Sequence, residues 1–303
     1  MTVIRRLLST GAMALLLCAG AFAANDSLET VEVTASREKL RKEIQTFVHQ
    51  VTRLEGEFVG RWGGFVCPMA VGVSDAQAQF IQRRIIEVQN TVRKKKPNAE
   101  KKCDPNLFVI ITDNADQVVA DWKERDPGMF RWKTRDGVSR SGGTGPVRTW
   151  HNAILTGGDG EAINEAATLS AMGASTNSQV TTGSRINISK PSCPTSGRIE
   201  AGCWEHINAV VVLVDTRAAG KVSVAQLADY ITVVSLSQID LSANLGGIDS
   251  ILRLFAQPRP DVPPTAMTEW DYAFLNGLYR ASYSPANQQR DIAARMVREL
   301  APR

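Results

Sequence analysis

The sequence has few histidines and none of the short motifs that mark the common catalytic sites. Its three histidines, His49, His151 and His206, stand far apart, so no two can face one metal ion from neighbouring turns of a helix. No H-E-x-x-H, G-x-S-x-G or G-x-x-x-x-G-K-[ST] motif is present, and no G-x-G-x-x-G follows a strand-like segment. Zinc peptidases, serine hydrolases with a nucleophile elbow and nucleotide-binding enzymes therefore have no support from a motif.

Excess charge and long hydrophobic runs are equally scarce. The chain of 303 residues has 35 Lys and Arg against 31 Asp and Glu, a formal net charge of +4, which is too balanced to favour nucleic acid as a partner. After residues 1–23, no run is long and apolar enough to cross a bilayer. The sequence therefore predicts no nucleic-acid partner and no integral membrane segment once those residues are removed.

The N-terminus has the pattern of a signal peptide. Arg5 and Arg6 precede an apolar run over residues 11–22, and Ala21-Phe22-Ala23 ends it with the small-x-small pattern that signal peptidase requires. The run is shorter than the roughly 20 apolar residues of a membrane-spanning helix. We predict that residues 1–23 are a cleaved signal peptide and that the mature protein is periplasmic or secreted. The alternative is a buried N-terminal helix.

A short stretch of alternating polar and apolar residues follows the signal peptide. In LETVEVTASR, residues 28–37, an extended backbone would have one apolar edge and one polar edge. The stretch resembles a TonB box, through which outer-membrane transporters pair with the periplasmic energy-coupling protein TonB. The resemblance implies that residues 24–37 are an extended tail that binds TonB or another periplasmic protein through Thr30, Val31, Glu32, Val33 and Thr34. The alternatives are pairing with the protein's own sheet and a coincidence of composition.

The remaining cysteines predict disulfides. Four stand after the signal peptide, Cys67, Cys103, Cys193 and Cys203, and an even number in an oxidising compartment is typical of two disulfide bonds. Sequence alone permits three pairings. We favour Cys67 with Cys103, which can join two neighbouring strands, and Cys193 with Cys203, which closes a short loop. A zinc site is the alternative, although no C-x-x-C spacing is present.

Hydrophobic periodicity predicts an α/β fold. FVCPMAVGV (residues 65–73) and PNLFVIITD (105–113) are typical of strands. The stretch 74–96 between them has apolar residues at helical spacing and begins with a capping box formed by Ser74 and Gln77. A strand, an amphipathic helix and a buried strand in this order form a βαβ unit whose two strands lie parallel.

The rest of the chain supplies further elements around this unit. A strand over residues 207–215 is strongly apolar, and the helix over 222–241, with a capping box of Ser223 and Gln226, is apolar on most sides and so should be central. Strands are also predicted at 148–155 and 184–189, and helices at 37–54, from 115 to a stop before Pro127, and from Thr268 and Ser284. With no internal repeat and no linker, residues 38–303 are predicted to form a single α/β domain with a mixed sheet and flanking helices.

Three C-terminal segments carry a family resemblance. LADYITVVSLSQIDL (227–241), DSILRLF (249–255) and MTEWDYAFLNGLY (267–279) resemble, in this order, uncharacterised secreted proteins of proteobacteria, which VCPMAVGV and CDPNLFVIITD also match. More distantly they resemble metzincin-like domains, in which an active-site helix is followed by a serine-containing turn and another helix. In zincins the central helix carries H-E-x-x-H, whereas this chain has Asp229-Tyr230-Ile231-Thr232-Val233 there. The resemblance implies a zincin-like scaffold without its zinc site, cofactor or catalytic residues.

These observations favour a non-catalytic binding protein of the periplasm or secreted fraction, with TonB as a candidate partner. The alternative is a secreted hydrolase whose active site is assembled from separate loops, with His151, His206, Glu205 and Asp215 as the candidate residues. His49 is interpreted as a structural side chain. A cleft that gathers two histidines and an acid would favour the hydrolase.

Overall fold

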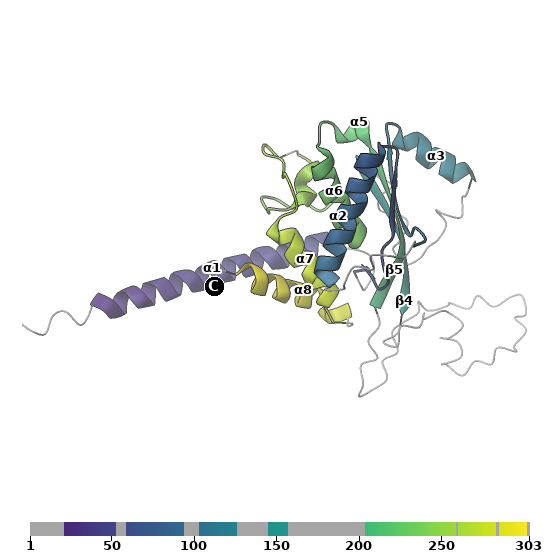
Figure 1. Ribbon diagram of the computed structural model, residues 1–303. Coiled ribbons are helices and arrows are strands. Elements are labelled where there is room, and N and C mark those ends of the chain that lie inside the picture. Colours follow the sequence, from purple (N-terminus) through teal and green to yellow (C-terminus); the bar gives the residue numbers. More distant parts are fainter. Residues whose placement is uncertain are drawn as a thin grey trace, which may run out of the picture.

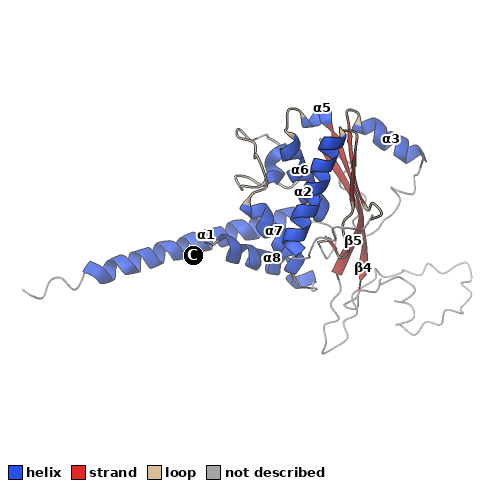
Figure 2. Cartoon of the chain, viewed as in Figure 1, coloured by secondary structure: helices blue, strands red, loops and turns tan. Residues whose placement is uncertain are grey.

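The computed structural model describes residues 21–52, 59–93, 103–125, 145–156, 204–258, 260–282 and 285–301. Over these ranges the chain is mixed α/β, with a five-stranded sheet, a thick layer of helices on one face and a shorter helix on the other (Figures 1 and 2). The predicted signal residues 1–20, the predicted strand at 184–189, Cys193 and Cys203 lie outside the described residues.

The sheet is parallel except for one strand. Its parallel members are β1 (Arg61–Trp62), β2 (Pro68–Val71), β3 (Leu107–Thr112) and β5 (Trp204–Asp215). β3 lies between β2 and the second half of β5, and β1 pairs with the first half of β5. The antiparallel strand, β4 (Val147–Thr156), pairs along β5. The helix that joins β2 to β3 completes the predicted βαβ unit, which the parallel pairing confirms.

Helices cover the face of the sheet on which Val109 of β3 and Val212 of β5 are fully buried. This layer contains α1 (Ala21–Val51), α2 (Asp75–Arg93), α6 (Val224–Leu236), α7 (Glu269–Arg280) and α8 (Pro285–Leu300), with the short helices α5 (Thr216–Ala219) and η2 (Ile251–Phe255) at its edges. On the opposite face, α3 (Ala115–Arg125) packs Trp122 against Trp150 of β4 in an edge-to-face contact. No helix among the described residues is long and apolar enough to cross a membrane.

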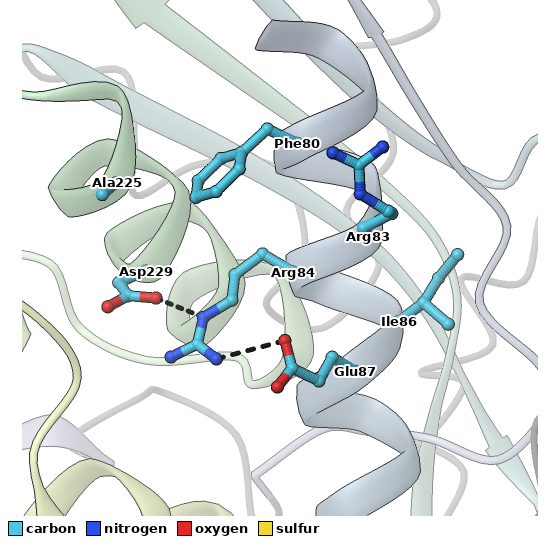
Figure 3. A pocket seen from close by; sticks show the side chains of 7 residues that line it. All are labelled: Phe80, Arg83, Arg84, Ile86, Glu87, Ala225 and Asp229. Atoms are coloured by element: carbon cyan, nitrogen blue, oxygen red, sulfur yellow. Dashed lines mark hydrogen bonds and ion pairs between the residues drawn. The ribbon is translucent and has the colours of Figure 1, made fainter. Parts of the chain in front are cut away.

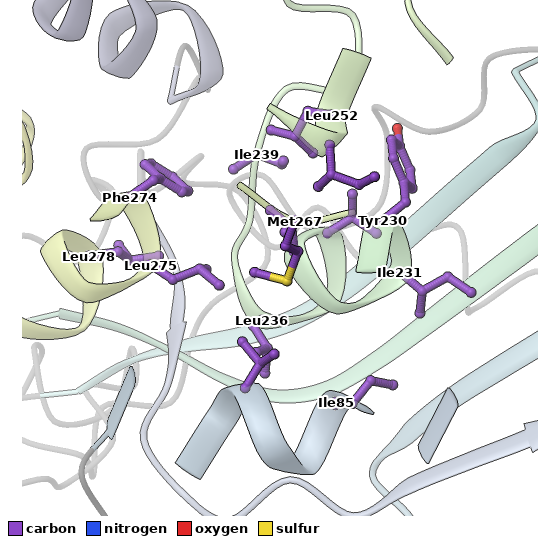
Figure 4. Packing of buried hydrophobic residues seen from close by; sticks show 14 of the residues in the cluster. Ile85, Tyr230, Ile231, Leu236, Ile239, Leu252, Met267, Phe274, Leu275 and Leu278 are labelled. Atoms are coloured by element: carbon purple, nitrogen blue, oxygen red, sulfur yellow. The ribbon is translucent and has the colours of Figure 1, made fainter. Parts of the chain in front are cut away.

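The central helix is α6, as its apolar composition predicts. Ten consecutive residues of α6, 227–236, are buried. Side chains from α2, α7 and the segments after α6 surround it in the main hydrophobic cluster (Figure 4). Both predicted capping boxes are present as well, with Ser74 bonded to Gln77 and Ser223 bonded to Gln226. Local sequence and long-range packing therefore agree on where these helices begin.

The start of α1 differs from the prediction. Residues 24–37 were expected to be an extended tail, but α1 begins at Ala21 and includes Thr30, Val31, Glu32, Val33 and Thr34. An extended strip satisfies its backbone hydrogen bonds only if a partner strand is present, whereas a helix satisfies them within itself. The C-terminal half of α1 gives that helix an anchor, because Ile44, Phe47 and Val51 are fully buried, and the rest projects from the body (Figure 1).

Candidate functional site

A groove lies along α2 at the point where this helix meets the first turns of α6. Its volume is about 650 Å³, and it is lined by Phe80, Arg83, Arg84, Ile86, Glu87, Ala225 and Asp229 (Figure 3). The two helices approach because α2 turns Ile81, Ile85 and Val88 into the core beneath α6, which leaves the opposite, more polar side of α2 facing outward. The groove is therefore a product of the amphipathic pattern of α2.

An ion pair between Arg84 and Asp229 forms the floor of the groove. Arg84 Nε donates to Asp229 Oδ1 at 2.5 Å, and Asp229 Oδ2 accepts the backbone N–H of Met267 at 2.7 Å. The Asp229 residue is only 5% exposed. Burial acts to lower the pKa of Arg84, but the hydrogen bond and charge of Asp229 outweigh it and leave the pKa raised. The contacts of Asp229 with Arg84 and Met267 thus tie together α2, α6 and the segment before α7.

Two side chains at the rim of the groove, Phe80 and Arg83, are exposed. The ring of Phe80 is 40% exposed and extends from α2 toward α6 in Figure 3. Arg83 is exposed and makes no hydrogen bond or ion pair with any residue that the structure describes, whereas Glu87 lies 3.4 Å from Arg84 Nη1. The groove therefore presents an aromatic surface beside two cations and two carboxylates, and Arg83 is the cation that has no ion pair among the described residues.

The residues proposed for a hydrolase do not form one site. His206 and Glu205 lie near the start of β5, whereas Asp215 ends it, nine residues and about 30 Å further along the strand. His151 of β4 is opposite Val210 of β5, about 13 Å from His206 on the same scale. The described part of the chain thus keeps His151 and Asp215 away from the adjacent Glu205 and His206.

Two of these candidates, His151 and Asp215, each have a structural role. His151 is buried, with Nε2 3.0 Å from Val234 O, and burial lowers its pKa to about 4. Asp215 caps two helices: Oδ1 accepts from Arg217 N and Ala218 N, and Oδ2 accepts from Ala115 N of α3. Burial acts to raise the pKa of Asp215, but these N–H donors outweigh it and lower the pKa.

His206 is half-buried and in contact with the segment after β1. Its ring stacks on Trp204 with ring centres 4.9 Å apart, and Nε2 accepts the backbone N–H of Gly64 at 3.1 Å. Burial, and then the charge of Arg93, lower the pKa of His206. This histidine is therefore held neutral with its lone pair engaged.

Asp271, near the start of α7, forms a second buried carboxylate site. Asp271 Oδ1 accepts from Ser250 Oγ at 2.6 Å, and Oδ2 accepts from Ile251 N and Thr268 N at 2.9 and 2.8 Å. Burial raises the pKa of Asp271, although these hydrogen bonds oppose the rise. Asp271 thus links α7 to the serine-containing turn ahead of η2. The sequence predicted that a helix begins at Thr268, which is the N-cap of α7, but no local signal predicted the contact of Asp271 with Ser250.

One predicted disulfide is confirmed. Cys67 and Cys103 are joined with an S–S distance of 2.00 Å and a Cα–Cα distance of 6.0 Å, just before the parallel strands β2 and β3. Asn106 fixes the same junction, because its Oδ1 accepts from Cys67 N and its Nδ2 donates to Phe65 O. The other predicted pair, Cys193 with Cys203, lies outside the described residues.

Metal ligands do not cluster in the described ranges: no three His, Cys, Asp or Glu side chains there come close enough to hold an ion. The geometry of the groove between α2 and α6 is therefore what makes it the candidate site.

Comparisons with protein-family models, with curated proteins and with solved structures gave no match.

Proposed function

We propose that the chain is a non-catalytic binding protein of the periplasm or secreted fraction, built on a zincin-like scaffold, and that the groove between α2 and α6 binds its ligand. The observation that carries this proposal is the Arg84–Asp229 pair. Asp229 stands in the part of α6 where a zincin would carry its zinc motif, and both of its oxygens are bonded, to Arg84 and to Met267 N. A carboxylate held in this way supports the scaffold instead of activating water.

The order of elements is the support for a zincin-like scaffold. The buried central helix α6 is followed by a turn that contains Ser250 and then by α7, which is the order of the metzincin-like segments that the sequence resembles. The bond between Ser250 and Asp271 gives that order a physical role, since it ties the turn to α7. A hydrolase assembled from His151, His206, Glu205 and Asp215 is less well supported, because these residues lie apart along β4 and β5.

The side chains that line the groove indicate which class of ligand it binds. Phe80 provides an exposed aromatic face, and Arg83 provides a cation whose preferred partner is a carboxylate. Arg84 contributes no net charge because Asp229 neutralises it, and the exposed carboxylate of Glu87 balances the charge of Arg83 in the groove as a whole. We therefore assign the groove to a peptide segment that carries an apolar side chain and a carboxylate, which would lay the apolar group on Phe80 and the carboxylate on Arg83.

A titration of the protein with the blocked tetrapeptide Glu-Phe-Leu-Glu, followed by amide NMR, tests this proposal. We expect shifts that map to α2 and to the first turn of α6. Phe80→Ala and Arg83→Gln should each weaken binding about fivefold to tenfold, the effect of losing roughly 1 kcal/mol. Phe65→Ala is the matched control, because Phe65 is also 40% exposed but does not line the groove. Shifts elsewhere, or equal losses in the control, would exclude the groove.

A further inference from the structure

The segment from Gly63 to Val66, between β1 and β2, lies against the start of β5. Gly63 packs so closely on His206 and Trp204 that a side chain at this position would collide with both rings. The next residue, Gly64, donates its N–H to His206 Nε2. The same two glycines accept hydrogen bonds from Arg93 of α2, whose Nη2 lies 2.6 Å from Gly63 O and whose Nη1 contacts Gly64 O.

The contact between His206 and Gly64 requires a neutral ring. A nitrogen can accept a backbone N–H only while it carries no proton, so Nε2 must hold the lone pair and the other ring nitrogen the proton. Protonation would place an N–H of the imidazolium against the N–H of Gly64. The hydrogen bond would then become a contact between two donors.

The charge of Arg93 opposes the protonation of His206. Arg93 of α2 approaches from the side of the glycines, and Arg61 of β1 lies over the neighbouring Trp204 ring, 5.2 Å from its centre. Tyr279 of α7 faces Arg93 at 5.9 Å, Glu205 precedes His206 on β5, and β4 places Ile154 opposite it. Of these groups Arg93 acts on the imidazole and lowers its pKa, so a charged ring would be repelled by Arg93 as well as unbonded.

We propose that His206 is an acid-sensitive switch that holds the 63–66 segment on β5 at neutral pH and releases it when the ring gains a proton. The change is local, because the rest of the segment is fixed by groups that do not titrate in this range. Asn106 binds Phe65 O and Cys67 N, and the Cys67–Cys103 disulfide anchors the end of the segment. Release therefore breaks the hydrogen bond of the Gly64 N–H and loosens Gly63 and Gly64 against the rings of Trp204 and His206, while Arg93 still binds their carbonyl oxygens.

The sign of the pH dependence follows from the lowered pKa of His206. Above the ordinary imidazole pKa of about 6.5 the contact is fully formed. Below that pH the imidazole of His206 binds a proton in the released state but not in the closed state. The population of the closed state therefore falls until the pH reaches the lower pKa that His206 has in the closed state. Between these two pKa values, the equilibrium constant for closing should fall about tenfold per pH unit.

The test is amide exchange and ¹⁵N NMR of the full chain from about pH 8 to about pH 4.5, with exchange rates corrected for intrinsic base catalysis. We expect the protection of the Gly64 amide to fall as the His206 ring titrates, while core amides of α6 stay protected. His206→Gln supplies an uncharged oxygen as acceptor and should make Gly64 protection independent of pH. His49→Gln, which replaces an exposed histidine of α1, should behave as the unchanged protein.

Three results would overturn the proposal. The first is a Gly64 amide that keeps its protection while the His206 ring becomes charged. The second is a His206 ring that stays neutral over the whole range. The third is the same loss of Gly64 protection in the His206→Gln variant. The first two require only the unchanged protein, so they hold even if that variant does not fold.

Discussion

Nε2 of His151 lies 3.0 Å from the carbonyl oxygen of Val234, so a strand side chain caps the buried end of the central helix. Three other side chains do the same for the adjacent carbonyls. Val233 O accepts from Ser237 Oγ at 2.7 Å, Ser235 O accepts from Trp62 Nε1 at 2.7 Å, and Leu236 O accepts from Tyr279 Oη at 2.8 Å. The last four carbonyls of α6 thus all have partners, which explains how this helix can end inside the core without solvent.

Removal of one of these donors should destabilise the protein measurably. Tyr279→Phe keeps the ring but leaves Leu236 O buried without its partner, and we expect a loss of about 1 to 3 kcal/mol of unfolding free energy. Urea denaturation at neutral pH measures it. Tyr230→Phe is the matched control, because the Tyr230 hydroxyl makes no hydrogen bond with the described residues and its loss should change stability far less. Equal losses in the two variants would contradict the capping role.

The extent to which the fold follows from the sequence depends on the range of the interaction. Capping boxes, the apolar helix α6 and the βαβ unit depend on neighbours in the chain or on a periodic apolar face, and periodicity predicted them. The Cys67–Cys103 bond followed from placing two strands side by side. By contrast, His151 and Val234 stand 83 residues apart, and Arg84 and Asp229 stand 145 apart. Only the packed sheet and helices bring such pairs together, so no spacing in the sequence marks them.

Acid should weaken the fold through His151. Its pKa is about 4 in the folded protein because of burial, against about 6.5 in an unfolded chain. Stability is therefore fully present above about pH 6.5 and falls as the pH drops toward 4, because only the unfolded chain binds the proton in that window. The loss should be on the order of 3 kcal/mol. Urea denaturation at about pH 7.5 and about pH 4.5 measures it.

His151→Gln tests the assignment of this effect, because the amide keeps a donor for Val234 O and cannot take up a proton. We expect the variant to lose most of the pH dependence. His206 contributes in the same direction, so the comparison is made on a His206→Gln background. His49→Gln on that background is the control, since His49 is exposed. An unchanged fall in stability in the His151→Gln variant would show that other groups titrate.

The N-terminal stretch yields a prediction about accessibility. If residues 30–34 dock onto TonB as an added strand, they must leave α1, because this helix includes them. A peptide of residues 24–37 should then bind the periplasmic domain of TonB more tightly than the whole chain does. Val33→Pro in the peptide should weaken binding, since proline lacks the backbone donor. Fluorescence anisotropy with a scrambled peptide as control measures both effects, and equal signals from the two peptides would remove TonB as a partner.

The ion pair at the floor of the groove should be worth more than an exposed one. Asp229→Asn removes the charge that Arg84 requires in a half-buried position, and we expect a loss of about 2 to 4 kcal/mol of unfolding free energy. Asp113→Asn breaks a pair with Arg217 in which both side chains are about 70% exposed, so it should cost less than about 1 kcal/mol. Because Asp229 also accepts from Met267 N, the loss cannot be assigned to Arg84 from a single variant. A double-mutant cycle with Arg84→Met isolates the pair, and a coupling energy near zero would mean that Asp229 acts through Met267 alone and that the groove floor is not fixed by its ion pair.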